Sequence, residues 1–183
     1  MPAALPRRSA GVTLIELMLV VGVIAALAAV AVPRFFAARE ATHGGAAHQA
    51  LLGSLMAASA HAASTGAEVV VCPGTPAGCL ATHDWTGGWI VFADLGGDRE
   101  RGSGDTLVQR AGALGGQARL RSTVGRTRIV FQPNGGAAGS NVTFTLCDGR
   151  GAAHARSLVM NNTGGLRGSA ATASAAEACL ARM

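Results

Sequence analysis

The longest apolar run of the chain begins near its N-terminus and contains a single charged residue. Residues 12–32, VTLIELMLVVGVIAALAAVAV, include only Glu16, close to the start of the run. At about 1.5 Å per residue, a helix of this length spans roughly 31 Å, close to the ~30 Å hydrocarbon thickness of a bilayer. The apolar core of a secretory signal is the alternative, but such cores are normally ~7–15 residues long. The run therefore predicts a membrane-spanning helix.

The pattern becomes amphipathic after the apolar run. Over residues 33–66, leucine and methionine recur at helical spacing between Leu51 and Met56, which predicts a continuation of the helix. Pro33 predicts a kink, because proline removes a backbone hydrogen bond and clashes with the preceding turn. The pair Gly44-Gly45 is expected to weaken the helix. We expect the leucine and methionine stripe to pack on a globular domain.

From residue 67 onward the period changes from helix to strand. Short segments rich in Val, Ile, Phe or Thr, bounded by Gly, Pro, Asp or Asn, predict seven strands. They are Glu68–Cys72, Gly88–Ala93, Asp105–Arg110, Gln117–Arg121, Thr127–Gln132, Asn141–Cys147 and Arg156–Asn161. This spacing favours an antiparallel sheet in a head of residues 67–183. The predicted class is α+β: a long N-terminal helix packed on an antiparallel β-rich head. The small-residue tail at 170–178 is expected to be poorly ordered except where a cysteine holds it.

A motif stands at the head of the apolar run. Residues 7–17, RRSAGVTLIEL, combine a basic leader, a glycine and an apolar helix with a glutamate at its fifth position. This resembles the class III signal of type IV pilins and of the pseudopilins of type II secretion, although those families usually have Phe in place of Val12. The resemblance implies that a prepilin peptidase cuts between Gly11 and Val12, removes the leader 1–11 and methylates the amine of Val12. It also implies that Glu16 pairs with the amine of Val12 on a neighbouring subunit. A carboxylate inside a membrane needs such a cationic partner.

The flanking charges predict the orientation of the membrane span. Arg7 and Arg8 precede it and are expected to remain in the cytoplasm, by the positive-inside rule. Arg34 and Arg39 oppose this bias, but the leader comes first in the chain. We therefore expect a single-pass protein with its head on the periplasmic side, and the resemblance to pilins implies the bacterial inner membrane and assembly into a periplasmic pseudopilus or a surface pilus.

A second resemblance lies within the predicted head. Residues 84–110, DWTGGWIVFADLGGDRERGSGDTLVQR, resemble the Trp-x-x-Gly-Trp-x-Val-Phe strand, acidic loop and following strand of the FimT/GspH family of minor pilins and pseudopilins. The stretches VTFTLCDGRG (142–151) and TGGLRG (163–168) fit the C-terminal part of that family. The resemblance implies a structural subunit whose partners are other pilins or pseudopilins, prepilin peptidase and the inner membrane.

No catalytic motif is found in the sequence. All 15 basic residues are arginine, which excludes lysine-dependent phosphate loops and Schiff bases. The five histidines are scattered, and HExxH, GxSxG and GxGxxG are absent. We therefore expect no enzyme activity, no cofactor and no metal. The net charge of +5 falls to +3 once Arg7 and Arg8 are removed, since 13 basic residues then face 10 acids.

The acidic loop and the tryptophans each admit two interpretations. Carboxylates between Asp94 and Asp105 on a Gly-rich turn suit calcium. Their spacing does not match an EF-hand, however, and Arg99 and Arg101 alternate with them, so a solvated loop with local ion pairs is favoured. Trp85 and Trp89 are interpreted as core or strand-face residues and not as a ligand platform.

Four cysteines in an exported head predict two disulfides, for which three pairings are possible. Cys72 and Cys79 bracket the loop CPGTPAGC, which favours their pairing and leaves Cys147 with Cys179. A zinc site is the alternative, but the six residues between Cys72 and Cys79 exceed the usual two to four.

DNA binding is the alternative function. FimT-type minor pilins take part in natural transformation in some bacteria, and their DNA-binding members carry a Gly-Arg-x-Arg motif. By this resemblance the motif falls on residues 164–167, where Gly165 replaces the first arginine and Arg167 remains. Arg150 and Arg156, with the pairs Arg119/Arg121 and Arg126/Arg128, are further candidates for contacts with phosphates.

Overall fold

The chain forms two compact units, residues 1–36 and residues 37–183, in a computed structural model that describes residues 11–137 and 139–181. The predicted leader lies almost entirely outside the described residues. Helix α1 (Leu14–Thr65) contains 52 residues, and part of it belongs to each unit. Pro33 and the Gly44-Gly45 pair both lie inside α1, so neither ends the helix.

All seven predicted strands are present in the second unit, with ends shifted by a few residues. The elements that follow α1 are β1 (Glu68–Thr75), β2 (Gly78–Cys79), β3 (Trp89–Asp94), β4 (Thr106–Ala111), β5 (Arg119–Ser122), β6 (Ile129–Phe131), β7 (Val142–Cys147), the 3-10 helix η1 (Ala152–His154), β8 (Arg156–Met160), β9 (Leu166–Ala170) and α2 (Ala173–Leu180). The sequence analysis missed β2, β9 and α2. The α+β class with a long N-terminal helix and an antiparallel head is confirmed.

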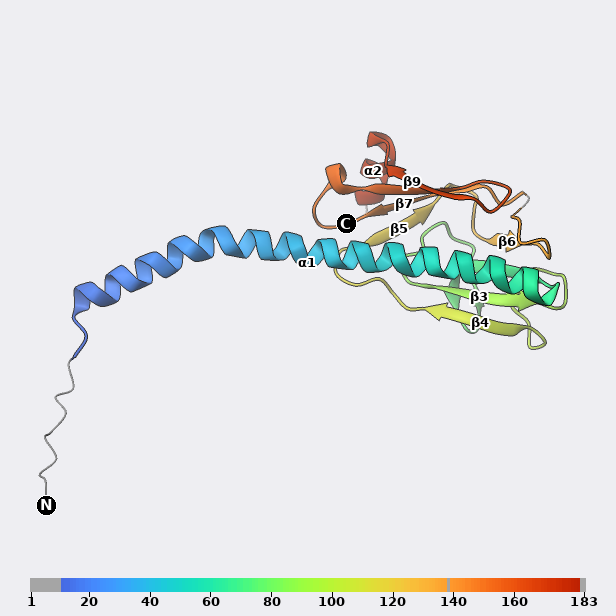
Figure 1. Ribbon diagram of the computed structural model, residues 1–183, viewed down its shortest axis with the longest axis horizontal. Coiled ribbons are helices and arrows are strands. Elements are labelled where there is room, and N and C mark those ends of the chain that lie inside the picture. Colours follow the sequence, from blue (N-terminus) through green and yellow to red (C-terminus); the bar gives the residue numbers. More distant parts are fainter. Residues whose placement is uncertain (1–10, 138, 182–183) are drawn as a thin grey trace, which may run out of the picture. The chain divides into compact units, whose positions relative to one another are not determined.

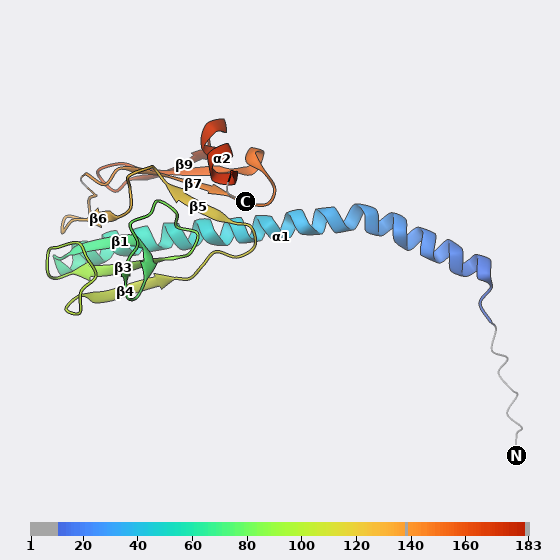
Figure 2. The ribbon, with the colours of Figure 1, turned by 180° about the vertical axis from the view of Figure 1, so that it is seen from behind.

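The strands form two antiparallel sheets. One has the order β2-β1-β3-β4, with β6 also paired to β1, and the other has the order β5-β7-β8-β9. Figures 1 and 2 show the C-terminal half of α1 running alongside both sheets. Side chains from this half of α1 and from both sheets form one hydrophobic core.

Helix α1 packs on the head through a narrow face of mostly small residues. Its buried positions recur at steps of three or four residues, with one adjacent pair: Gly44, Ala47, Leu51, Ser54, Leu55, Ala58 and Ala62. The predicted leucine and methionine stripe is therefore only partly correct. Met56 is 61% exposed, because it lies on a different face of α1 from the neighbouring Leu55.

The two tryptophans lie in the core, one of the two placements that the sequence analysis favoured. Both are fully buried, and each indole N–H donates to a serine: Trp89 Nε1 to Ser54 Oγ and Trp85 Nε1 to Ser122 Oγ, both at 3.0 Å. These bonds satisfy donors that would otherwise be buried without partners. Because Ser54 lies on α1, the bond from Trp89 also fixes the helix against the sheet that contains β3.

The C-terminal tail forms helix α2, so the expectation of poor order over residues 170–178 was wrong, whereas the expected attachment by a cysteine is present. Thr172 caps α2 by accepting a hydrogen bond from the Ala175 N–H at 3.3 Å. The alanines that suggested low complexity are the residues with the highest helix propensity, and a threonine cap favours the start of a helix. Ala176 and Cys179 are buried against the head.

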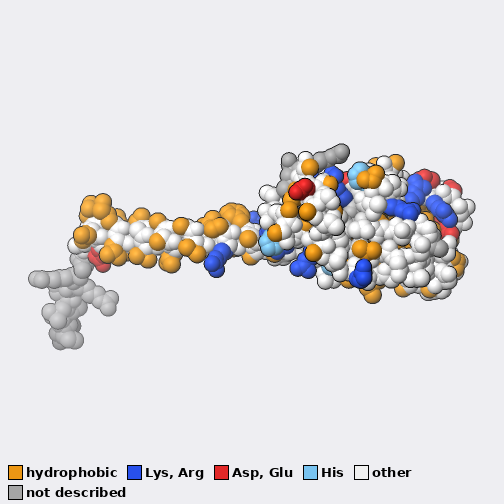
Figure 3. Space-filling model, turned by 90° about the horizontal axis from the view of Figure 1, so that it is seen from above, with side chains coloured by type: hydrophobic (Ala, Val, Ile, Leu, Met, Phe, Trp, Pro, Cys, Tyr) orange, Lys and Arg blue, Asp and Glu red, His pale blue; other side chains and the backbone are white. Residues whose placement is uncertain are grey.

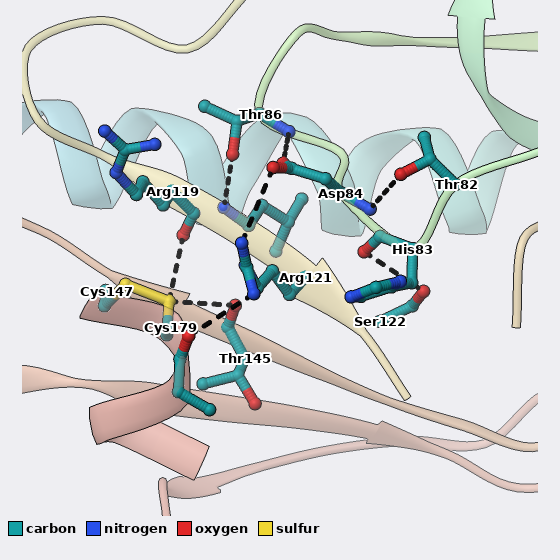
Figure 4. A network of polar contacts seen from close by, with 12 residues as sticks. Thr82, His83, Asp84, Thr86, Arg119, Arg121, Ser122, Thr145, Cys147 and Cys179 are labelled. Atoms are coloured by element: carbon teal, nitrogen blue, oxygen red, sulfur yellow. Dashed lines mark hydrogen bonds and ion pairs between the residues drawn. A yellow bond between two sulfur atoms is a disulfide. The ribbon is translucent and has the colours of Figure 1, made fainter. Parts of the chain in front are cut away.

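The four cysteines form Cys72–Cys79 and Cys147–Cys179, the two pairs favoured by the sequence analysis. The first joins β1 to β2, and the second joins the end of β7 to α2. Figure 4 shows the second disulfide beside Thr145 and Arg119. An eight-residue helix makes few contacts of its own, and the disulfide also attaches α2 covalently to β7.

Candidate assembly helix and arginine surface

The predicted cleavage and assembly residues lie at the start of α1. Thr13 precedes the helix, and its hydroxyl accepts a hydrogen bond from the Glu16 backbone N–H at 3.3 Å. The sequence Thr13-Leu14-Ile15-Glu16 has the spacing of a helix-capping motif, which the sequence analysis missed. A carboxylate in the first turn also interacts favourably with the helix dipole. Glu16 therefore favours the start of the helix as well as supplying a charge.

The first unit presents an apolar surface. Every residue from Gly11 to Phe36 is exposed, and Ile15, for example, is 76% exposed. Figure 3 shows hydrophobic side chains along the N-terminal half of α1 on the face in view. By length and composition this helix could cross a membrane. An apolar surface of this extent needs lipid or other protein to cover it.

The carboxylates of the acidic loop bind their own backbone. Asp94 accepts hydrogen bonds from the N–H groups of Gly97 at 2.7 Å and Arg99 at 2.8 Å. Asp105 accepts from Gly102 at 2.7 Å and Leu95 at 2.9 Å, and these bonds lower its pKa. The arginines that alternate with the acids contribute ion pairs, such as Arg99 with Glu68 at 3.2 Å.

Arg150, a candidate DNA contact, is paired with a buried carboxylate. Its Nε and Nη2 donate to the two oxygens of Asp148 at 2.9 and 2.7 Å. The Asp148 side chain is 4% exposed and that of Arg150 is 22% exposed. Burial by itself raises the pKa of Asp148, but the hydrogen bonds and positive charge of Arg150 outweigh burial and lower it. The charge of Arg150 is therefore already balanced within the head.

The same ion pair lies against α1. Gly44 of α1 approaches Asp148 so closely that an added Cβ would lie 2.5 Å from Asp148 Oδ2. One turn earlier, Glu40 accepts hydrogen bonds from the N–H groups of Gln117 and Gly149 at 3.0 and 3.4 Å. Two loops of the head are thus attached to the helix at this point. The sequence analysis gave Glu40 and Asp148 no role.

Arg156 and Arg167 lie on opposite faces of one sheet. Arg156 on β8 stands across from Leu146 and Ala170, and Arg167 on β9 stands across from Val159. Residues opposite one another share a face, and successive residues of a strand alternate faces. Arg156 therefore shares the face of the core residue Leu146, whereas Arg167 lies on the reverse face. Both side chains are exposed.

Most of the remaining candidate arginines are also occupied. Figure 4 shows Arg121 beside the Asp84 carboxylate, from which it lies 3.8 Å. Arg121 also donates to the Ala178 carbonyl of α2 at 3.3 Å. Arg126 donates to the Gly139 carbonyl at 2.7 Å, and Arg128 pairs with Glu100 at 2.6 Å. The arginines named in the sequence analysis thus do not form one free basic surface.

Sequence comparison identifies the family. A sequence model described as Type II transport protein GspH matches residues 47–164, which is more than half of the chain. The chain belongs to the GspH family. A second model, the prokaryotic N-terminal methylation motif, matches residues 6–32 of this GspH-family chain. Comparison with curated proteins finds no matching relative.

Solved structures show the same fold. Two crystal forms of the type IV minor pilin FimU of Pseudomonas aeruginosa (strain PAO1) are similar to the GspH-family chain, with TM-scores of 0.52 and 0.53 at 16% and 18% sequence identity. The first match covers 74% of this chain and 90% of FimU, and the second covers 71% and 94%. The fold is therefore pilin-like.

Proposed function

We propose that this GspH-family chain is a membrane-anchored minor subunit of a type II secretion pseudopilus or a type IV pilus. Prepilin peptidase cleaves it after Gly11 and methylates Val12. The apolar part of α1 then holds the subunit in the inner membrane, with the head in the periplasm, until it joins a filament. The observation that carries the proposal is the exposed apolar surface from Gly11 to Phe36, which contains one carboxylate, Glu16.

Glu16 is proposed to guide assembly by charge. A carboxylate at the centre of a membrane helix costs ~2.5–3.5 kcal/mol on insertion scales, so a position among lipids or packed helices favours a cationic partner. Cleavage after Gly11 creates a new amine on Val12. The amine of a neighbouring subunit would neutralise Glu16 where both are removed from water.

Glu16→Gln is expected to leave cleavage intact and to reduce incorporation into filaments at least tenfold. The amide keeps the size of the side chain but removes the charge that attracts the neighbouring amine, and a desolvated ion pair that loses one partner is strongly disfavoured. The measurement compares, by immunoblot, the cleaved subunit in the membrane fraction with that in sheared or purified filaments.

Two control variants complete this test. Gly11→Glu is expected to remain uncleaved in the membrane, which separates a processing defect from an assembly defect. Thr13→Ser keeps the capping hydroxyl and is expected to assemble normally. Wild-type incorporation of the Glu16→Gln subunit would contradict the proposed role of Glu16.

DNA capture, as in FimT-like subunits that act in natural transformation, is the second candidate. One observation favours it: Arg167 is exposed and makes no ion pair within residues 11–137 and 139–181. Arg150 is neutralised by Asp148, and Arg156 lies on the other face of the sheet, so Arg167 would bind with little help from either.

If the subunit captures DNA, Arg167→Ala is expected to weaken binding at least fivefold. The slope of log K against log salt concentration should also fall by about one, the value for one lost phosphate contact. The full chain in detergent micelles is titrated with double-stranded DNA at low and moderate salt. Arg110→Ala is the matched control, because Arg110 is exposed on β4 in the other sheet. Absence of binding at low salt would eliminate this candidate.

A further inference from the structure

Strand β9 has a free edge. It is the last strand in the order β5-β7-β8-β9, and Figures 1 and 2 show it at the margin of its sheet. Hydrogen bonds from Ala171 N to Ala155 O and from Asn161 N to Gly165 O flank the β8–β9 ladder. In an antiparallel pair, bonding alternates along the strand, so the odd-numbered residues of β9 bond to β8. The N–H and C=O groups of Leu166, Gly168 and Ala170 therefore point away from the sheet.

Two hollows lie between this edge and α1, and together we name them the β9 groove. One, of about 470 Å³, is lined by His48 of α1, by Arg156 and by Gly168 to Ala170 of β9. The other, of about 410 Å³, has a mainly apolar lining that includes Met56 and Ala60 of α1 and Leu166, together with the polar residues Ser59, Asn134 and Thr163. The groove thus has a basic end near Ala170 and an apolar end near Leu166, along a strand of five residues.

The basic end has donors without matching acceptors. The Arg156 side chain makes no hydrogen bond or ion pair with any other residue that the structure describes, although its backbone belongs to the β8 ladder. The nearby carboxylates are engaged, because Asp148 pairs with Arg150 and Glu40 accepts two backbone N–H groups. His48 and His154 line the same hollow as Arg156. This lining suits a carboxylate.

We propose that the β9 groove binds an extended segment of a neighbouring pilin or pseudopilin subunit, which adds to β9 as a further strand. An unpaired strand edge provides backbone hydrogen bonds, and the adjoining hollows select side chains at alternate positions. An Asp or Glu of the segment lies opposite Ala170 and contacts Arg156. Apolar side chains two and four residues away lie opposite Gly168 and Leu166. This proposal rests on the proposed function, because filament assembly brings the heads of neighbouring subunits together.

The occupant follows from charge and geometry. A flexible anion would satisfy Arg156 but leave the strand edge and the apolar end unused. An added strand satisfies Arg156, the strand edge and the apolar end together, because its alternate side chains face the same side, about 7 Å apart. That spacing matches Ala170, Gly168 and Leu166, which occupy alternate positions of β9.

The test uses the full chain in detergent micelles and fluorescently labelled, end-capped heptapeptides. The probes are TDTVTVT and its reverse, TVTVTDT, which allow antiparallel and parallel pairing, with TNTVTVT and TVTVTNT as neutral counterparts. Fluorescence anisotropy is expected to show that one aspartate peptide binds at least tenfold more tightly than its asparagine counterpart. Arg156→Gln is expected to remove that preference, whereas Arg110→Gln leaves it within twofold.

A second variant tests the strand edge itself. Gly168→Pro removes an N–H that points away from β8, so the internal ladder is kept while strand addition is blocked. Peptide binding is expected to be lost, with the circular dichroism spectrum unchanged. Equal binding of the aspartate and asparagine peptides, no binding by either aspartate peptide, or an unchanged preference in Arg156→Gln would overturn the proposal. These outcomes are independent of processing and of the Glu16→Gln assembly test, so the groove can fail while the proposed function stands.

Discussion

Replacing Asp148 with asparagine is expected to lower the free energy of unfolding by about 3 kcal/mol at neutral pH. The Asp148 side chain is 4% exposed, so its replacement leaves the Arg150 guanidinium without a counter-charge at a buried position. The asparagine also presents an NH₂ donor to the guanidinium where the aspartate presented an acceptor oxygen. Arg150 itself is 22% exposed, so water compensates for part of the loss. The expected value is therefore at the lower end of what breaking a buried ion pair costs.

The effect should depend on pH in a defined direction. The pKa of Asp148 is lowered in the folded chain, because hydrogen bonds from Arg150 and the charges of Arg150 and His154 outweigh burial. A lowered pKa stabilises the fold above the unfolded pKa of about 3.9, and this contribution is lost as the pH falls through the folded pKa. The difference between wild type and Asp148→Asn should therefore be constant from about pH 7 to 5 and shrink below about pH 4.

Urea unfolding of the full chain in detergent micelles measures this difference. Trp85 and Trp89 report on the head, because both indoles are buried in its core. Asp98→Asn is the control, since Asp98 is an exposed loop residue, and it should change stability by less than about 0.5 kcal/mol. A difference that persists undiminished to pH 2 would show that ionised Asp148 is not its source.

The sequence predicted those features of the fold that depend on periodicity. The apolar run gave the first part of α1, and alternation gave seven strands, because these patterns are repeated over several residues. The strand β9 was missed because its sequence, LRGSA, contains only one large apolar residue and lies on an exposed edge. Helix α2 was missed because a run of alanine and serine has the composition of a flexible tail as well as of a short capped helix.

The candidate site was less predictable, because it depends on which charges are already paired. Arg150 and Arg167 look equivalent in sequence, yet Asp148 neutralises one and the other is exposed. The attachment of Glu40 to Gly149 joins residues 109 positions apart, a separation that no local pattern reports. The two faces occupied by Arg156 and Arg167 likewise follow from the β8–β9 register, which the sequence analysis did not contain because β9 was not predicted.

Gly44→Ala is expected to destabilise the head by about 1–3 kcal/mol, although alanine is normally the better helix residue. The added Cβ would lie 2.5 Å from Asp148 Oδ2, an atom that Arg150 holds at 2.7 Å. The carboxylate can make room only by weakening the ion pair or by shifting α1 away from the head. Either change costs more than the helix propensity that alanine gains. The measurement is the same urea unfolding followed by tryptophan fluorescence.

The adjacent glycine provides the matched control. An added Cβ at Gly45 meets nothing within 4 Å, and Gly45 is exposed, so Gly45→Ala should stabilise the head by about 0.5–1 kcal/mol. Two adjacent substitutions of the same kind should thus have opposite signs. In an Asp148→Ala background the clash is absent, so Gly44→Ala should become neutral or stabilising. If Gly44→Ala still destabilised the head in that background, Gly44 would be required for a reason other than its contact with Asp148.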